Sequence, residues 1–326
     1  STLVVTNNKY TVEIYMLDIG VQTKGIIPEM DIDKGFGMIS EAGFTRVDIN
    51  IDTFLKNSDL YAGKVNKFFD ASIEELTIYF NQYTKAMDKY GIRPSQMHAP
   101  YPVRVEGNDK QNDYMQGVVI PKSILIANML GVPWVVIHPF KMQYLYNKDI
   151  ERKMNITYFQ MLIPLLKEYN VGVCFENLYE GMGGRIVEGV CADPYDVVCY
   201  IDTLNEMAGQ ELFGLCLDTG HLQLVKRDPY EYIKVVGNRL KALHIHENDS
   251  FNDIHQMPYT FGDCSYDGQN WNGLFRGLKA IGYEGTLSYE TFPCVNSFPR
   301  NMRGHVLNAI HEIGVYMKEC IETEML

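Results

Sequence analysis

Short runs of β-branched and aromatic residues alternate along this chain with longer amphipathic stretches. Polar residues follow each short run before helical spacing begins, a pattern typical of strands that alternate with helices. The predicted strands are Thr11–Leu17, Arg46–Ile51, Ser95–His98, Trp134–His138, Val171–Glu176, Phe213–Asp218, Leu240–His244 and Gly285–Glu290. The predicted helices are Ile32–Ala42, Ile73–Tyr90, Ile120–Leu130, Glu151–Tyr169, Tyr195–Glu206, Tyr230–Asn238, Trp271–Ile281 and Arg300–Glu322.

Eight strands and eight helices in units of about 40 residues predict a single (β/α)8 barrel, an α/β fold, with residues 1–326 as one domain. Asp193-Pro194 and Asp228-Pro229 each offer an N-cap followed by proline, and Gly131 follows a helix as a C-terminal stop. A doubly wound sheet is the structural alternative, but it gives no reason for polar residues at so many strand ends. Residues 181–193 are expected to form a glycine-rich loop.

Composition and charge narrow the class of protein. The chain is 46% hydrophobic and 12% aromatic, which is enough to bury a full core. Its net charge of −12 disfavours a nucleic-acid partner, because phosphate backbones attract Lys and Arg. No apolar run approaches the ~20 residues of a membrane span, and the first residues lack a signal-peptide pattern. The seven scattered cysteines indicate reduced thiols, so we expect a cytoplasmic protein with no membrane partner.

Histidines and carboxylates gather where the predicted strands end. Five of the eight histidines lie at or just past a strand end, and His255 follows in the next loop; the five are His98, His138, His221, His244 and His246. Glu176, Asp218 and Glu290 also end strands. The carboxyl ends of barrel strands converge around one axis, and these side chains are the donor set for Zn²⁺ or Mn²⁺. The sequence therefore predicts a divalent-metal site.

Three stretches carry a resemblance to a known family: LCLDTGHL at 215–222, HIHENDSFNDIHQMPYTFGDCSYDGQNW at 244–271 and IGYEGTLSYE at 281–290. They resemble the xylose isomerase-like barrel superfamily, which holds sugar (phosphate) isomerases and epimerases alongside apurinic-site nucleases of the endonuclease IV type. The resemblance covers roughly residues 95–292. It implies one divalent metal bound by Glu176, Asp218, His244 and Glu290.

The nuclease branch of this superfamily uses a cluster of three metals. Its pattern implies additional ligands, for which this sequence has the candidates His98, His138, His221, Asp253 and His255. Isomerase-like members share these additional positions, so the resemblance does not fix the number of metals. We expect one metal, with up to three as the alternative.

The paired glutamates suggest a reaction. Glu176 and Glu290 on opposite sides of a metal suit proton transfer next to a carbonyl, through a metal-stabilised enediolate. In the alternative, both are only ligands and a bound water is the base. His221 is a further catalytic candidate that would orient the substrate, bind a second metal or support a ligand.

The sequence departs from the ketose 3-epimerase pattern at one position. Epimerases of that type carry an arginine near position 250, where this chain has Ser250, so a phosphate clamp from this loop is disfavoured. Tyr101 and Trp271 are candidates for stacking on a sugar ring, although either can be a packing residue.

These observations together predict a metal-dependent isomerase or epimerase of a small sugar or sugar-derived keto compound. The alternatives are a multi-zinc phosphodiesterase of the endonuclease IV type and a non-catalytic sugar-binding barrel. The expected partner is a small sugar, and a homo-oligomer stays open.

Overall fold

A computed structural model of the chain describes residues 2–7, 10–15, 17–27, 31–142, 148–262 and 268–323. Eight parallel strands form its central sheet, in the order β11-β10-β7-β6-β5-β4-β3-β12. These strands are β3 (Asp18–Gln22), β4 (Arg46–Asn50), β5 (Arg93–His98), β6 (Trp134–Ile137), β7 (Gly172–Glu176), β10 (Phe213–Asp218), β11 (Leu240–His244) and β12 (Thr286–Tyr289).

Backbone hydrogen bonds just past the ends of β11 and β12 close this sheet into a barrel. Ile245 N donates to Ser288 O at 2.8 Å, and Glu290 N donates to Ile245 O at 3.0 Å. The first barrel strand β3 pairs with the last, β12, in parallel register. The predicted (β/α)8 barrel is therefore confirmed.

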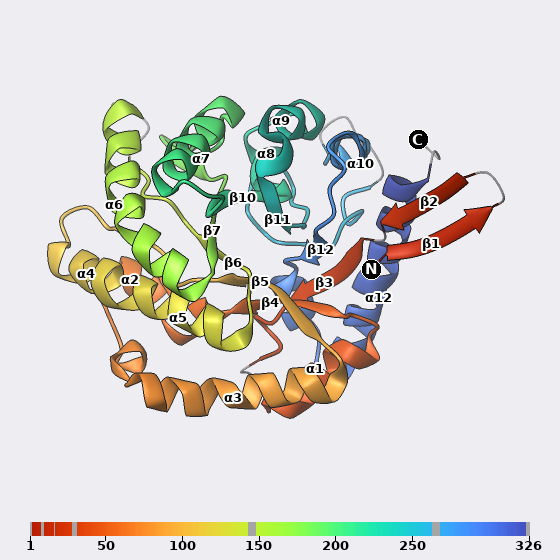
Figure 1. Cartoon of the computed structure of the whole chain (residues 1–326), viewed down its shortest axis with the longest axis horizontal. Coiled ribbons are helices and arrows are strands. Elements are labelled where there is room, and N and C mark those ends of the chain that lie inside the picture. The colour runs from red at the N-terminus through yellow and green to blue at the C-terminus, as the bar shows by residue number, and fades with distance from the viewer. Residues whose placement is uncertain are drawn as a thin grey trace.

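Helices connect successive strands and surround the barrel (Figure 1). The helices are α1 (Ile32–Glu41), α2 (Asn57–Tyr61), α3 (Ile73–Tyr90), α4 (Asp109–Tyr114), α5 (Ile120–Leu130), α6 (Lys148–Tyr169), α7 (Pro194–Ala208), α8 (Thr219–Leu224), α9 (Pro229–Val236), α10 (Trp271–Ala280), α11 (Phe292–Asn296) and α12 (Arg303–Glu322). The expected caps are present: Asp193 accepts from Tyr195 N, Asp228 accepts from Glu231 N, and Gly131 ends α5 with a left-handed φ of 69°.

The first expected strand is wrong as a barrel strand. Residues 10–15 do form a strand, β2 (Tyr10–Tyr15), but it pairs antiparallel with β1 (Thr2–Asn7) in a hairpin at the edge of the molecule (Figure 1). The barrel strand is instead Asp18–Gln22, which contains Gly20. A Cβ at Gly20 would lie 2.8 Å from Cγ2 of Thr286 and 3.0 Å from Cβ of Arg46, so the neighbouring strands require glycine there.

The glycine-rich segment after β7 is also more ordered than expected. It forms an antiparallel hairpin of β8 (Tyr179–Met182) and β9 (Arg185–Glu188). Gly183 and Gly184 connect the two strands with φ values of 56° and 76°. A two-residue turn with positive φ at both positions is what Gly-Gly favours.

The buried apolar residues form two clusters, one outside the sheet and one inside the barrel. The main core packs the helices against the outside of the sheet, while Val136, Cys174, Cys216 and Ala242 form a smaller apolar cluster together with Trp134. At the carboxyl ends of the strands the buried side chains become polar and ionisable. Among the described residues, no helix has the length and apolar character needed to span a bilayer.

Candidate metal centre

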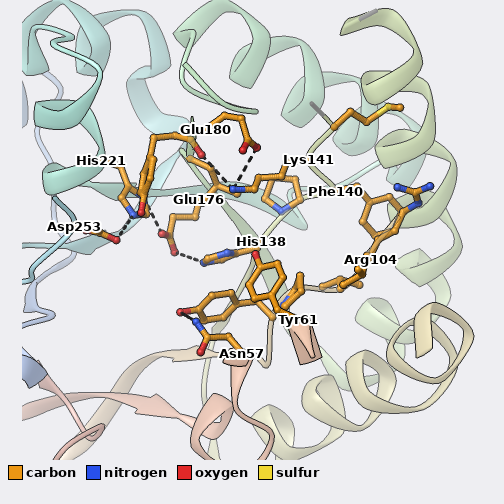
Figure 2. A pocket seen from close by; sticks show the side chains of 18 of the residues that line it. Asn57, Tyr61, Arg104, His138, Phe140, Lys141, Glu176, Glu180, His221 and Asp253 are labelled. Atoms are coloured by element: carbon orange, nitrogen blue, oxygen red, sulfur yellow. Dashed lines mark hydrogen bonds and ion pairs between the residues drawn. The ribbon is translucent and has the colours of Figure 1, made fainter. Parts of the chain in front are cut away.

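Glu176, at the end of β7, lies at the centre of a ring of imidazoles. Its carboxylate oxygens approach His98 Nε2 at 3.5 Å, His138 Nε2 at 3.3 Å, His221 Nδ1 at 3.2 Å and His244 Nδ1 at 3.2 Å. Figure 2 shows Glu176 between His138 and His221. These four histidines lie at or just past the ends of four different strands, His221 in the first turns of α8, so the barrel brings together residues that are far apart in the sequence.

A second group of donors surrounds Asp253, in the loop after β11. His221 Nε2 and His255 Nε2 each lie 3.3 Å from Oδ2 of Asp253. His246 Nε2 lies 2.9 Å from Asp218 Oδ1, and its ring stacks on His255 with centroids 3.9 Å apart. His221 thus contacts carboxylates of both groups.

Glu290 joins this second group to the first. Its Oε2 lies 3.5 Å from His244 Nδ1 and 3.5 Å from His255 Nδ1. Glu176 and Glu290 are both buried, at 2% and 7% exposed.

Outer hydrogen bonds orient the imidazoles toward the centre. His244 Nε2 lies 2.9 Å from Asp48 Oδ2, and Gln96 Nε2 donates to the same Asp48 oxygen at 3.0 Å. His221 Nδ1 donates to the carbonyl of Asn177 at 2.8 Å. One ring nitrogen of each imidazole is held by an oxygen acceptor, as in metal-ligating histidines, and this leaves Nδ1 of His244 and Nε2 of His221 directed at the other donors of the cluster.

Burial and charge act in opposite directions on these groups. Burial raises the pKa of the Glu176 carboxyl, but His138 and His244 lower it more, and the net pKa lies well below its usual value. Burial lowers the pKa of His221, whereas Asp218 and Asp253 raise it more, to well above the ordinary value. Burial likewise lowers the pKa of His255, but Asp253 and Glu290 shift it upward to about 9. The carboxylates therefore require compensating positive charge, which protons or a divalent cation can supply.

The donor set fits a transition metal such as Zn²⁺ or Mn²⁺. Imidazole and carboxylate are the ligands these ions take, and Glu176 Oε2 and His244 Nδ1 are buried without a hydrogen-bond partner among the described residues. The described residues contain four groups of three side chains, and within each group the ligand atoms lie within 4.8 Å of one another. They are His98/Glu176/His244, His246/His255/Glu290, Glu176/Asp218/His221 and Asp218/His244/Glu290.

A cavity of about 370 Å³ opens above this cluster (Figure 2). Glu176, Glu290 and His221 lie in its lining. The Tyr101 ring, also in the lining, stacks on His138 with centroids 4.1 Å apart, and its hydroxyl accepts a hydrogen bond from Asn57 Nδ2 at 3.0 Å. The cavity has the size and the mixed polar and aromatic wall of a small-molecule site.

Residues 36–305 match the sequence profile described as the xylose isomerase-like TIM barrel. The chain belongs to this family. Among solved structures similar to this xylose isomerase-like barrel is the 3-keto-D-glucoside 4-epimerase from E. coli, with a TM-score of 0.66, 15% identity, and 91% and 99% of the two chains covered. The IOLI protein with a bound zinc atom has a TM-score of 0.67 at 16% identity, over 95% and 100% of the two chains. At these identities the likeness shows the fold.

Two curated relatives are closer in sequence. The protein y4fM of Sinorhizobium fredii is 25% identical over 274 residues, which cover 80% of this chain and 81% of that protein. A probable endonuclease 4 of Staphylococcus aureus is 26% identical over 207 residues, which cover 60% of this chain and 64% of that protein. Of these two relatives, the second has a name that states an activity.

The structure brings together the residues that the sequence singled out as ligands. These are Glu176, Asp218, His244, Glu290, His98, His138, His221, Asp253 and His255. Tyr101 lies in the cavity wall as expected. Trp271 does not: its ring is 1% exposed and packs near Tyr259, because the residue begins α10 and faces the core, so the structure gives it no stacking surface.

The sequence assigned no specific role to two residues of the site. His246 had no assigned role, although a His-x-His pattern at a strand end can place both rings on one side, since side chains alternate with period two. Asp48 is the other, and its bond to His244 makes it a supporting residue.

Proposed function

We propose that the chain is a divalent-metal-dependent isomerase or epimerase that acts on a small sugar or a sugar-derived keto compound. One observation carries this proposal. Glu176 and Glu290 follow strands that are not neighbours in the barrel, yet both line the cavity and both approach Nδ1 of His244, at 3.2 and 3.5 Å. Two carboxylates beside one candidate ligand can supply the base and the acid of a proton transfer next to a carbonyl.

In this reaction one glutamate removes a proton from the carbon next to the substrate carbonyl, and the other carboxyl group returns one. Return to the opposite face of the same carbon gives an epimer. Return to the former carbonyl carbon, with transfer of the hydroxyl proton between the two oxygens, gives an isomer. A bound divalent cation would polarise the carbonyl and stabilise the enediolate.

The other residues of the cavity have positioning roles in this proposal. Glu176, Asp218, His244 and Glu290 would hold one Zn²⁺ or Mn²⁺, and the remaining donors would admit up to three ions. His221 would orient a substrate hydroxyl, since it lines the cavity with its Nδ1 fixed on Asn177. Tyr101 would cover one face of the sugar. The similar structures named as sugar epimerases support this assignment.

The direct test replaces each glutamate by its amide. We expect Glu176→Gln and Glu290→Gln each to lower the turnover of a ketose panel by at least ~10²-fold, because the amide keeps the shape but is not a base. Deuterium uptake from D₂O at the substrate carbon measures the proton transfer itself. Metal content is measured in the same samples, and a variant with full metal and near-normal turnover would remove that glutamate from the acid–base role.

A phosphodiesterase of the endonuclease IV type is the second candidate. It is favoured by the further ligands His98, His138, His255 and Asp253, and by the relative named probable endonuclease 4. It is opposed by the net charge of −12 and by the pairing of Lys141, at the cavity rim, with Glu180 at 3.3 Å. Cleavage of an abasic-site duplex at catalytic turnover, with no deuterium entering any sugar, would decide for it.

A further inference from the structure

A second cavity lies beside the first on the same face of the barrel. It has a volume of about 340 Å³ and lies over the loops that follow β3, β4 and β12. Its lining includes Lys24, Asp52, Thr53, Asn57, Phe292 and Asn296. None of these residues is a candidate metal ligand or an acid–base residue of the proposed reaction.

The second cavity shares one wall residue with the first. Asn57 lines both cavities, and its Nδ2 donates to the hydroxyl of Tyr101 in the wall of the first. Glu290 lines the first cavity, and Phe292, two residues later, lines the second. Lys24 Nζ lies 4.5 Å from the Phe292 ring centroid and 6.0 Å from that of Tyr101. A ligand that extends past Tyr101 and Asn57 would therefore enter the second cavity.

The charges of the second cavity favour a neutral ligand. Lys24 and Asp52 form an ion pair with side chains only 21% and 6% exposed, so each cancels the other. Lys56, at the edge of the cavity, is exposed to solvent. A phosphate or carboxylate would thus meet Asp52 as well as Lys24.

The remaining groups fit a hydroxylated ring. Phe292 offers an aromatic surface, while Asn57, Thr53 and Asn296 offer amide and hydroxyl groups. An aromatic face together with amide and hydroxyl groups is the kind of wall that binds a sugar ring.

We propose that this second cavity binds the non-reacting sugar unit of a glycoside, so that the substrate is a keto sugar of disaccharide size. The proposal rests on the proposed function, because it extends the same active site. Where the glycosidic bond joins the anomeric carbon of the reacting unit, that carbon is blocked, and the reaction would be epimerisation next to a ketone elsewhere on the same ring. A proton leaves that carbon and another returns to its opposite face, with no net oxidation or reduction.

The test compares disaccharides with their component sugars on the full, metal-loaded chain. Binding of maltose, cellobiose, lactose, sucrose, glucose, galactose and fructose is measured by calorimetry. We expect at least one disaccharide to bind about tenfold more tightly than either component, and Ser58→Trp, which fills the cavity from its exposed edge, to abolish this advantage. Ala62→Trp, just past the end of the same helix α2 and outside both cavities, is the matched control and should keep the advantage.

Phe292→Ala is a second variant, which should reduce the disaccharide advantage by removing the aromatic surface. Unchanged far-ultraviolet circular dichroism verifies the fold of each variant. An advantage that survives Ser58→Trp, or no advantage for any disaccharide, would overturn the second-cavity proposal even if ketoses take up deuterium. A disaccharide advantage lost in Ser58→Trp, with no deuterium uptake by any keto sugar, would instead support the cavity and contradict the proposed reaction.

Discussion

Asp48 shows how one side chain below the site controls the residues above it. Its Oδ2 contacts Nε2 of His244 and accepts a hydrogen bond from Nε2 of Gln96. The Asp48 side chain is fully buried inside the barrel. A carboxylate behind an imidazole fixes the orientation of the ring and increases its basicity. Asp48 thus decides which nitrogen of His244 faces Glu176 and Glu290.

We therefore expect Asp48→Asn to lower metal affinity by about 10- to 100-fold while the barrel stays folded. The amide keeps the size of the side chain but loses the charge that holds His244 Nε2. Competition with a chromogenic chelator measures the affinity. Asp33→Asn is the control, because Asp33 pairs with Lys89 on the surface, and equal affinities in both variants would contradict the role of Asp48.

Gly220 gives a second test at the scale of one residue. A Cβ there would lie 2.0 Å from Cε1 and 2.5 Å from Nδ1 of His246, so Gly220→Ala must displace that ring. If His246 is a ligand, metal affinity should fall by at least about tenfold. Gly117→Ala is the control, since its Cβ would meet nothing within 4 Å. Full metal affinity in Gly220→Ala would exclude His246 from the ligand set.

At this scale the sequence singled out most of the candidate ligands that the structure brings together, but not the residues that support them. Glu176 and Asp218 end strands and Glu290 directly follows one, and the barrel rule alone places strand ends around one axis. The bond from His244 to Asp48 joins residues of β11 and β4. No local sequence pattern indicates that two residues so far apart in the chain are in contact. Trp271 is the opposite case, a residue that the sequence offered for the site and that the structure buries in the core. Aromatic character alone does not tell which side of a helix end faces the core.

At the scale of elements, Asp218 has two functions in one position. Its Oδ2 lies 3.0 Å from His246 Nε2, and its Oδ1 accepts a hydrogen bond from His221 N at 2.7 Å as the N-cap of α8. The helix that presents His221 therefore begins on another member of the same candidate site.

We expect Asp218→Ala to be less stable than Asp218→Asn by about 1 kcal/mol in metal-free protein, since asparagine caps helices and alanine does not. Both substitutions remove the charge, so their difference reports the cap together with the contact to His246. Urea unfolding in the presence of a chelator measures it. Equal unfolding free energies for the two variants would show that α8 does not depend on this cap.

The elements that the sequence did not place correctly share a physical cause. Glycine weakens the strand signal of Asp18–Gln22, yet Gly20 is there because Thr286 and Arg46 leave no room for a Cβ. The better strand pattern of residues 10–15 belongs to a hairpin outside the barrel. Strand propensity reports how well side chains pack on a sheet, not which sheet they join.

At the scale of the whole molecule, the site is a concentration of charge that folding must hold together. Glu176, Asp218, Asp253 and Glu290 approach one another through shared histidines in a largely buried region. A ligand that binds only the folded state and neutralises this charge stabilises the fold by mass action.

We expect Zn²⁺ or Mn²⁺ at about 100 times its dissociation constant to stabilise the protein by about 2.7 kcal/mol and to raise the melting temperature by several degrees. Differential scanning calorimetry with and without a chelator measures the shift, and elemental analysis measures metal per chain. An unchanged melting temperature together with less than about 0.2 metal per chain would contradict the metal site.

The barrel can close only when β12, its last strand, pairs with β3 and with the segment after β11. During synthesis at about 5–20 residues per second, β3 leaves the ribosome on the order of tens of seconds before β12. Throughout that interval the nascent sheet has two open edges, and Glu290 does not yet exist. No partial translation product can hold the complete donor set, so the centre is assembled in the step that closes the barrel.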